Sequence, residues 1–439
     1  AERRLRGWMG VCGVVGVLLF GSQIAEISAR SALRGYDNTF NYLWLRSAMV
    51  DGDWDFRNDL EQCNTLTPAY RAAALGLPVT PAGRVPNKYG VGWSLVTLPF
   101  YLVADGMVAA GRWLGLSSLE RDGFNPVYQI CIQMGHALLA LASLLLAERV
   151  VRAWVAADTP VWPAVVALWA ASPLLYYQTV DLSMSHGVAF FAVALLAWAL
   201  VRAKAAPRMI WPWVLAGAAW GLAVVTRFQL AIFGLLAVPV WLAQWPDKAR
   251  LVRAAGGAIA GAAPLILLQL WAWHAVYGHW LVFSYGVEGE GFHWRHPEFA
   301  RSLFSPWHGL FYWHPFLLVA TLGLFGWAWR CRGTGGAALV AVAGTAYVNA
   351  AWWCWWFGSS FGLRAYDAAL LPLMAGFAWL LRSAARRWRT LLWGAAILAG
   401  AWNFYVALLY RSGAISRSQP VTWGQMVEAV RGLGDAMRF

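Results

Sequence analysis

Charged residues are scarce in this sequence. Asp, Glu, Lys and Arg account for 13% of the 439 residues, whereas hydrophobic residues account for 60%. Soluble domains usually carry about 25% charged residues, and the mean hydropathy of this chain is +0.51. The composition therefore excludes an ordinary water-soluble domain and indicates a protein that crosses the membrane several times.

Cysteine pairs and metal-binding motifs are also missing. The five cysteines, Cys12, Cys63, Cys131, Cys331 and Cys354, include no Cys-X-X-Cys pair. The eight histidines form no His-X-X-X-His or His-Glu-X-X-His motif. These absences predict neither a disulfide framework nor a metal site. The sequence also lacks a repeat of fixed period and a low-complexity tract.

The chain is nevertheless basic, with a formal net charge of +13. Its basic residues stand in short clusters between apolar segments, such as 248–253 and 382–389. This pattern is typical of cytoplasmic loops, so it favours anchoring in a membrane over binding to nucleic acid. The 31 tryptophans fit an interfacial belt. We interpret the first apolar segment as an anchor, because it lacks a small-residue cleavage site.

Long apolar segments recur through most of the chain. A bilayer core of about 30 Å requires roughly 20 apolar residues per helix, and these segments lack the alternation of β-barrel strands. We predict an all-α, polytopic membrane protein with roughly eleven to thirteen transmembrane helices. The expected spans lie near residues 7–24, 89–111, 126–147, 161–179, 187–201, 210–226, 229–245, 254–273, 309–328, 336–351, 368–381 and 390–410.

The positive-inside rule places the basic clusters after residue 148 in the cytoplasm. The loops around Asp181, Arg227 and Tyr285 then share the opposite face. A cytoplasmic N-terminus requires one more crossing between residues 25 and 125. Two alternatives stay open: a short helix near Thr67 to Leu77 enters the membrane, or one span near 89–147 is broken.

We interpret residues 1–410 as one transmembrane domain and 411–439 as a weakly amphipathic tail. Residues 25–88 and 274–306 form the first and second external loops. In the first loop, apolar residues at helical spacing predict a helix at the membrane interface, which ends at the turn Asp51-Gly52-Asp53. Its apolar stripe comprises Phe40, Leu43, Trp44, Ala48 and Val50, and its polar side comprises Asn41, Arg46 and Ser47.

The stretch Gly35-Tyr36-Asp37-Asn38 places a carboxylate beside this helix. Two interpretations of Asp37 stay open. A carboxylate beside an apolar cavity can accept a proton from a hydroxyl group held within hydrogen-bond reach. Asp37 is also suited to cap the helix by accepting a hydrogen bond from the amide of Thr39 or Phe40.

Three further stretches combine polar residues with expected spans. Lys88, in Asn87-Lys88-Tyr89-Gly90, would meet a phosphate or extend its ammonium to the interface. Asp181 and His186 would orient a sugar or assist proton transfer, and Asp181 is alternatively a helix cap. Arg227 interrupts two apolar runs, where an arginine needs a partner or a wet cavity unless it is an interfacial turn residue.

The stretch from Trp352 to Tyr366 is the densest local signal. Aromatic rings such as Trp355 and Trp356 stack on sugars, and the planar guanidinium of Arg364 suits phosphate. An aromatic belt at the interface explains the tryptophans equally well. It does not explain the glycine-serine turn and the arginine that follow.

Taken in order, these stretches resemble the GT-C glycosyltransferases. These polytopic enzymes take sugars from polyprenyl-phosphate carriers, and they include the protein O-mannosyltransferases and the lipid A aminoarabinose transferases. The closer likeness is to a poorly characterised bacterial branch. The matching motifs are Tyr36-Asp37 to Arg46-Ser47 with 51–56, Asn87-Lys88-Tyr89-Gly90 with Leu98-Pro99-Phe100, Ser183-Met184-Ser185-His186, Thr226-Arg227-Phe228-Gln229, 303–310 and 355–364.

The resemblance implies a glycosyltransferase of a bacterial inner membrane, with its active site on the periplasmic or extracellular face. The substrates would be a polyprenyl-phosphate-linked sugar and a glycan, lipid or protein acceptor, and no cofactor is expected. In this family an acid of the first external loop is the catalytic base, which places that role on Asp37. Many members carry two adjacent acids, whereas this chain has Asp37-Asn38. Metal dependence therefore stays open, and Asp181 is the candidate for a second acid.

The resemblance also suggests a mechanism. A polyprenyl phosphate is a good leaving group, so Asp37 would deprotonate the acceptor while cations stabilise the phosphate, and direct displacement would invert the sugar. The expected phosphate ligands are Lys88, Arg227 and Arg364. We expect substrate contacts from Tyr36, Asn38, Asn87, Tyr89, His186, Tyr285, His308, Trp355 and Trp356.

Two other functions are compatible with the composition. A transporter or lipid flippase would show repeated halves and a substrate site at the membrane midplane. A non-catalytic subunit of a membrane complex predicts that Asp37 and Arg364 face no shared cavity.

Overall fold

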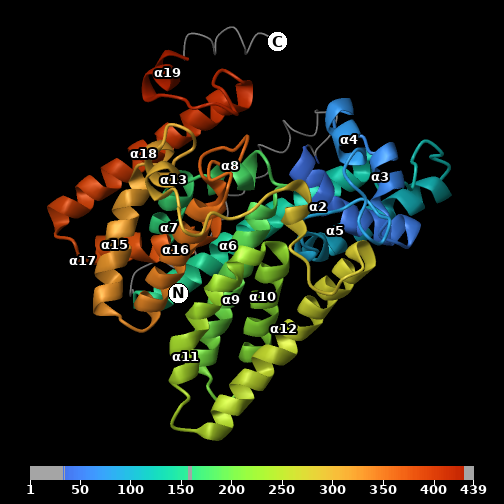
Figure 1. The fold of residues 1–439 in the computed structure, drawn as a ribbon. Coiled ribbons are helices and arrows are strands. Elements are labelled where there is room, and N and C mark those ends of the chain that lie inside the picture. The colour runs from blue at the N-terminus through green and yellow to red at the C-terminus, as the bar shows by residue number, and fades with distance from the viewer. Residues whose placement is uncertain (1–32, 34, 157–160, 430–439) are drawn as a thin grey trace.

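The computed structural model describes residues 33, 35–156 and 161–429 (Figure 1). Within these residues every regular element is a helix, and one isolated β-bridge pairs Phe292 with Trp352. The all-α prediction is therefore confirmed. The first expected span, residues 7–24, lies outside the described residues.

Six helices of the described residues are long and apolar enough to cross a membrane, and each coincides with an expected span. They are α5 (Gly92–Trp113), α6 (Pro126–Trp154), α9 (Ser185–Ala205), α12 (Lys248–Tyr277), α16 (Thr334–Ala351) and α18 (Arg386–Ser412). Their starts follow local chemistry. Asn125 caps α6, whose first residue is a proline, and Asp247 caps α12.

The other expected spans are shorter or interrupted helices. Proline explains two interruptions, because Pro173 and Pro315 start new helices and cannot continue old ones. The elements are α7 (Trp162–Ala170), α8 (Leu174–Thr179), α10 (Trp211–Thr226), the 3₁₀ helix η2 (Phe228–Ala237), α11 (Val238–Leu242), α14 (Leu310–Trp313), α15 (Phe316–Arg330), the 3₁₀ helix η4 (Arg364–Ala369) and α17 (Leu370–Ser383). Several of these breaks leave polar backbone and side chains next to the cavity described below.

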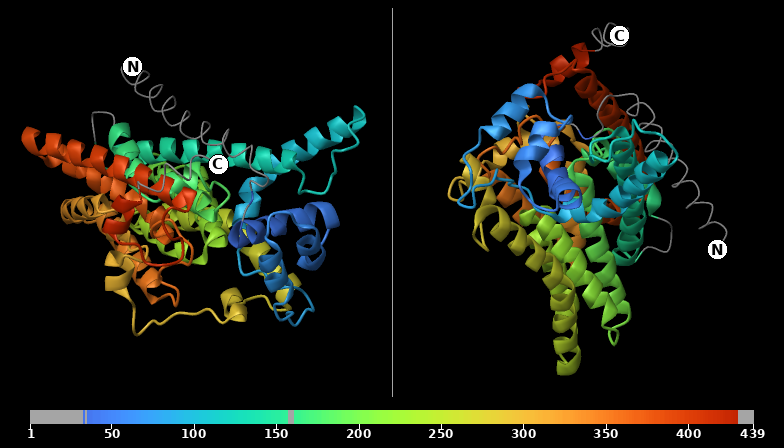
Figure 2. Two further views of the ribbon diagram at one scale, coloured as in Figure 1. Left: turned by 90° about the horizontal axis from the view of Figure 1, so that it is seen from above. Right: turned by 90° about the vertical axis from the view of Figure 1, so that its right-hand side faces the viewer.

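Helices α9, α10 and α12 pack side by side, and α15 packs on α17 (Figures 1 and 2). Small residues allow the close approach of α10 to α12. A Cβ atom at Gly217 would lie 1.9 Å from the Ala258 carbonyl oxygen, and one at Gly261 would lie 1.9 Å from the Val214 carbonyl oxygen. Helix pairs in membranes commonly use small residues in this way. Helix α10 ends at Thr226, and Arg227 begins the next segment.

The predicted helix of the first loop is present. It comprises α2 (Tyr36–Arg46) and a π-helical turn (Ser47–Asp51), and Gly52 ends it in the left-handed conformation, as the turn motif predicts. The predicted division into two faces is wrong in part. Asn41 and Arg46, assigned to the polar side, are buried, whereas Ala48 is exposed. Tertiary contacts explain the difference, because Arg46 forms ion pairs with Asp51 and Asp59 inside the loop.

The rest of the first loop contains α3 (Phe56–Gln62) and α4 (Pro68–Leu75). Helix α4 coincides with the short helix expected near Thr67 to Leu77. Its eight residues span about 12 Å, which is too short to cross a bilayer core of about 30 Å.

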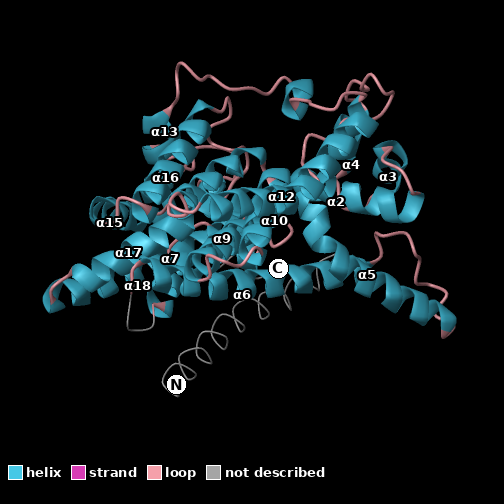
Figure 3. Cartoon of the chain, turned by 90° about the horizontal axis from the view of Figure 1, so that it is seen from below, coloured by secondary structure: helices cyan, strands magenta, loops and turns pink. Residues whose placement is uncertain are grey.

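The second loop starts later than predicted, because α12 continues to Tyr277 and ends at Gly278. This loop runs along one edge of the molecule (Figure 3) and contains the 3₁₀ helix η3 (Ser284–Glu288) and α13 (Phe299–Phe304). In the expected tail, α19 (Trp423–Glu428) packs near α14, because the indole of Trp423 donates to the carbonyl of Tyr312.

Candidate active site

A cavity of about 1030 Å³ lies where the first loop, the second loop and the interrupted helices meet. Its polar wall includes Asp37 of α2, Arg227 after α10 and Arg364 of η4. Its apolar wall is formed by Phe228, Trp273, Leu281, Val282, Phe283, Phe292, Trp294, Trp352 and Phe357. The cavity therefore joins a charged site to a largely aromatic surface.

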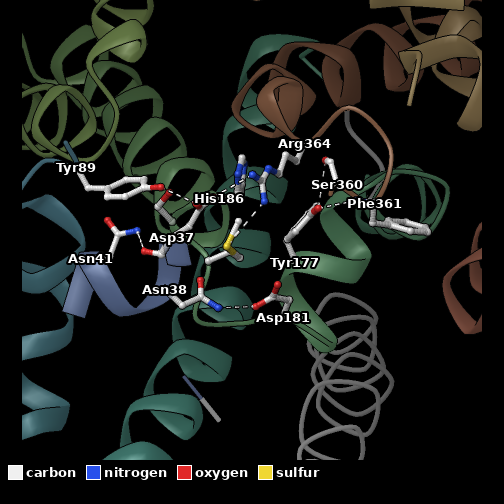
Figure 4. Close-up of polar contacts among 12 residues, drawn as sticks. Asp37, Asn38, Asn41, Tyr89, Tyr177, Asp181, His186, Ser360, Phe361 and Arg364 are labelled. Carbon is white, nitrogen blue, oxygen red and sulfur yellow. Dashed lines mark hydrogen bonds and ion pairs between the residues drawn. The ribbon is translucent and has the colours of Figure 1, made fainter. Parts of the chain in front are cut away.

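Asp37 lies in the first turn of α2, between two donors from distant parts of the chain (Figure 4). The Tyr89 hydroxyl donates to Oδ1 at 2.5 Å, and Arg364 Nη2 donates to Oδ2 at 2.9 Å. The predicted capping role is wrong, because Gly35 occupies the N-cap position and no side chain caps this helix. The carboxylate is directed into the cavity instead.

The surroundings of Asp37 favour its ionised form. Burial alone raises the pKa of a carboxyl group. The positive charge of Arg364, the hydrogen bond from Tyr89, and the charges of Lys88 and Arg227 outweigh that effect and hold the pKa of Asp37 below its usual value. Asp37 is therefore a carboxylate at neutral pH.

Arg364 is held by Asp37 but keeps donors for a ligand. Its Nη1 lies 4.0 Å from Met184 Sδ, and its Nε has no hydrogen-bond partner among the described residues. The hypothesis of a non-catalytic subunit predicted that Asp37 and Arg364 would face no shared cavity. They line the same cavity and form an ion pair, so this expectation is wrong.

Arg227 is a cation surrounded by neutral groups. Its backbone is extended and separates α10 from η2. Nη1 lies 3.2 Å from Ser185 Oγ and 3.4 Å from His186 Nε2, and the Gln229 amide, turned to accept, bonds Nε and Nη2 at 3.2 and 3.1 Å. No carboxylate of residues 35–156 and 161–429 lies within 4.0 Å of its guanidinium. The positive charge of Arg227 is thus not neutralised by direct pairing.

Lys88 is bound to the second loop. Its Nζ lies 2.7 Å from Glu288 Oε2 and 3.0 Å from Glu290 Oε1. The rings of Tyr36 and Tyr285 lie 5.6 and 5.7 Å from the ammonium, within the range of cation–π attraction. Burial lowers the pKa of Lys88, but the two glutamates outweigh this effect and raise it, so Lys88 stays charged.

Asp181 and Asn38 also line the cavity, and they are hydrogen-bonded to each other. Asn38 Nδ2 donates to Asp181 Oδ1 at 3.0 Å (Figure 4). Tyr36, Tyr89 and Tyr285, which were expected to contact substrate, also line the cavity. Within the part of the chain that the structure describes, no three His, Cys, Asp or Glu side chains gather closely enough to hold a metal ion.

Two expected substrate ligands lie behind the cavity wall. Asn87 is buried and donates to the backbone carbonyl of Phe40 at 2.8 Å, so it fixes the turn that carries Lys88. His186 is 1% exposed and contacts Arg227 instead of the cavity. Both residues support lining residues without lining the cavity themselves.

Three other expected ligands also lie outside the cavity. His308 Nδ1 contacts the Trp356 carbonyl at 2.9 Å. The ring of Trp356 stacks on Trp307 at 4.2 Å, and Trp355 meets Trp307 edge-on. These aromatic residues form a packed cluster next to the loop that carries Arg364.

Two carboxylates that contact Lys88 and one buried acid were not among the predicted site residues. Glu288 and Glu290 form the motif Glu-Gly-Glu, an acidic signal in an otherwise aromatic loop. Asp367 follows Arg364 by three residues, which places both on one face of a 3₁₀ helix. Asp367 is 1% exposed, and neither of its oxygens has a hydrogen-bond partner among the described residues.

Comparison with known proteins identifies the fold. No family model and no curated protein matches this sequence. Among solved structures, the chain is similar to ArnT from Cupriavidus metallidurans, crystallised with undecaprenyl phosphate, with a TM-score of 0.53 and 17% sequence identity. The match covers 98% of this chain and 70% of that chain. The protein therefore has the GT-C fold that its ordered motifs imply.

Proposed function

We propose that this protein is a membrane glycosyltransferase that moves a sugar from a polyprenyl-phosphate donor to an acceptor hydroxyl group. One observation carries the proposal: Asp37, Arg227 and Arg364 share a cavity with an extended aromatic wall. The fold of ArnT, whose structure holds undecaprenyl phosphate, adds support. A carboxylate, two guanidinium groups and an apolar surface match an acceptor hydroxyl, a phosphate and an isoprenoid chain.

In this proposal Arg227 and Arg364, rather than Lys88, are the main phosphate ligands. Arg227 has no direct carboxylate partner among the described residues, and Arg364 Nε has no hydrogen bond there. Lys88 is bound by Glu288 and Glu290, so it reaches a phosphate only after leaving them. Planar guanidinium groups also suit phosphate oxygens better than an ammonium does.

The charges of Asp37, Arg227, Arg364 and the donor phosphate sum to about zero before and after transfer. Arg227, Arg364 and ionised Asp37 sum to one positive charge, and the donor is a phosphodiester with one negative charge. Transfer moves the acceptor proton to Asp37 and leaves a polyprenyl phosphate with nearly two negative charges, facing two arginines. The site therefore need not exchange an ion with water during the reaction.

Each bond change has an assigned group. The acceptor oxygen attacks the anomeric carbon as Asp37 takes its proton. The bond from that carbon to the phosphate oxygen breaks, and its electron pair stays on the phosphate, where Arg227 and Arg364 stabilise it. Attack from the side opposite the phosphate inverts the sugar configuration.

Donor binding strengthens the base in this scheme. In the empty site Arg364 holds Asp37 and lowers the pKa of its carboxyl group. A phosphate competes for the same guanidinium, which removes part of that stabilising charge and raises the pKa of Asp37. Asp37 thus becomes a better base when a donor is present.

The remaining lining residues contact the sugar and the acceptor in this proposal. Asp181 and Asn38 line the cavity near Asp37, and Tyr36, Tyr89 and Tyr285 supply aromatic faces. We place this side of the cavity at the periplasmic or extracellular face of the inner membrane, in line with the distribution of basic clusters. The acceptor is a glycan, lipid or protein.

Transfer assays test the proposal. Membranes containing wild-type protein are incubated with a panel of radiolabelled polyprenyl-phosphate monosaccharides, and transfer of label to any acceptor is measured. We expect transfer from at least one donor, and a loss of about 10²- to 10⁴-fold in Asp37→Asn. Glu298→Gln is the matched control, because this carboxylate is exposed on the second loop and does not line the cavity.

The outcomes separate the hypotheses. Full transfer by Asp37→Asn would remove Asp37 as the base. Movement of a labelled polyprenyl phosphate across the bilayer without sugar transfer would favour a lipid flippase.

A further inference from the structure

His186 connects the two arginines that face the cavity. It is the second residue of α9 and is 1% exposed. One ring nitrogen, Nε2, lies 3.4 Å from Arg227 Nη1. The other ring nitrogen, Nδ1, faces the 3₁₀ helix η4 and lies 3.6 Å from Oδ2 of Asp367, three residues after Arg364. The side chain therefore lies between Arg227 and the helix that carries Arg364.

The contact with Arg227 sets the tautomer of His186. An arginine side chain can only donate hydrogen bonds, so Nε2 must accept, and the ring proton must sit on Nδ1. That proton then faces η4, the helix that carries Arg364 and Asp367. The ring of Tyr177 lies 5.0 Å from the imidazole, centroid to centroid, and restricts its plane.

Asp367 lies behind this arrangement. Its Oδ2 is 3.6 Å from His186 Nδ1, which is longer than a hydrogen bond. Neither oxygen of Asp367 has a hydrogen-bond partner among the described residues, so Asp367 packs against the imidazole without bonding it.

The neutral surroundings matter for phosphate binding. Arg227 is oriented by Ser185, His186 and Gln229, all uncharged acceptors. Its guanidinium is therefore not directly paired with a carboxylate of the described residues and can bind an anion. Arg227 and Arg364 also repel each other, so a fixed separation requires a rigid group between the segments that carry them.

We propose that His186 is a positioning residue that orients Arg227 and sets its distance from Arg364. The inference rests on the proposed function, because it treats the two arginines as phosphate ligands. His186 does not touch substrate in this role. It differs from the expectation that His186 binds the sugar.

Binding of two lipids tests this role. Radiolabelled undecaprenyl phosphate and undecaprenol, which has the same chain without phosphate, are bound to full-length protein in nanodiscs. We expect His186→Leu to weaken undecaprenyl phosphate binding about tenfold, the loss of one hydrogen bond to a charged group, and to leave undecaprenol binding unchanged. His186→Gln retains an acceptor oxygen near the Nε2 position, so we expect it to stay within about threefold of wild type.

Two further variants sharpen the test. Asp367→Asn has nearly the same shape, and neither oxygen of Asp367 has a hydrogen-bond partner among the described residues, so we expect wild-type binding of undecaprenyl phosphate. In an Arg227→Ala background, His186→Leu should have no further effect, because the group that it orients is gone. Asp59→Asn, a buried carboxylate of the first loop paired with Arg46, is the matched control for removing a buried acid.

The possible failures can be told apart. If Arg227→Ala leaves undecaprenyl phosphate binding unchanged, the proposed phosphate site is overturned, and this inference with it. If Arg227→Ala weakens binding but His186→Leu does not, only the positioning role is overturned. Equal losses for undecaprenyl phosphate and undecaprenol in His186→Leu would show a general packing role and would also overturn it.

Discussion

Gly90 is a position where one methyl group should disturb the site without touching it. A Cβ atom there would lie 2.1 Å from the Val225 carbonyl oxygen, 2.9 Å from its carbonyl carbon and 3.1 Å from Gln269 Oε1. The nearest atoms belong to the backbone of α10, which cannot rotate away. Gly90→Ala therefore requires the chain segments to separate by about 1 Å, at a typical overpacking cost of about 1–3 kcal/mol.

The displacement would reach the reacting groups. Tyr89, which donates to Asp37, precedes Gly90, and Arg227 follows the end of α10 by one residue. Shifts of about 1 Å in a catalytic arrangement can cost about 10²-fold in rate. We expect Gly90→Ala to lower the thermal unfolding midpoint by several degrees and sugar transfer by about 10²-fold.

Gly106 of α5 provides the matched control. A Cβ atom there would meet nothing within 4 Å. Gly106→Ala should be neutral or stabilising by up to about 1 kcal/mol, because alanine favours helices. Intrinsic tryptophan fluorescence in detergent measures unfolding for both variants, and labelled donor measures transfer. Wild-type stability and transfer in Gly90→Ala would refute the close packing of this segment on α10.

Three other variants probe single contacts. In Tyr89→Phe, Asp37 loses a hydrogen bond that lowers its pKa, so the acidic limb of the pH–rate profile should move to higher pH. In Glu288→Gln, Lys88 loses one of its carboxylates, and undecaprenyl phosphate binding should tighten about threefold. Burial lowers the pKa of His308 to about 4 in the folded protein. Between about pH 4 and 6.5 this residue therefore binds more protons in the unfolded protein than in the folded protein. Acidification from pH 7 to 5 should therefore cost about 2 kcal/mol in wild type that His308→Asn does not lose.

Each of these three predictions has an outcome that would contradict it. An unchanged acidic limb in Tyr89→Phe would exclude its hydroxyl as a determinant of the base. Weaker phosphate binding in Glu288→Gln would mean that the glutamate helps to place Lys88. For His308, the thermal unfolding midpoint is followed at both pH values, and equal losses in wild type and variant would contradict the burial argument.

Hydropathy predicted much of the fold, because long apolar helices reveal themselves in local sequence. The six long helices of the described residues coincide with expected spans. Breaks within other spans follow proline, as at Pro173 and Pro315. The faces of α2 were harder to predict. Arg46 is buried and forms ion pairs with Asp51 and Asp59. A helical wheel contains no information about such partners.

The ordered motifs identified several of the residues that line the cavity. Asp37 and Arg364 were both candidates, yet they are 327 positions apart, and only the fold brings them to 2.9 Å. Local pattern favoured a capping role for Asp37, because it could not include Tyr89 or Arg364. Trp355 and Trp356 were expected to contact substrate, but they pack in an aromatic cluster outside the cavity. Local sequence could not separate the two cases, because sugar-stacking residues and packed aromatic clusters have the same composition.

The most direct test of the account is a cryo-electron microscopy map of the protein with undecaprenyl phosphate. We expect the isoprenoid chain along the aromatic wall and the phosphate within hydrogen-bond distance of Arg227 and Arg364, with the Asp37–Arg364 ion pair opened. A phosphate outside this cavity would contradict the account. A phosphate bound by Lys88 alone, with the Asp37–Arg364 pair intact, would contradict it equally.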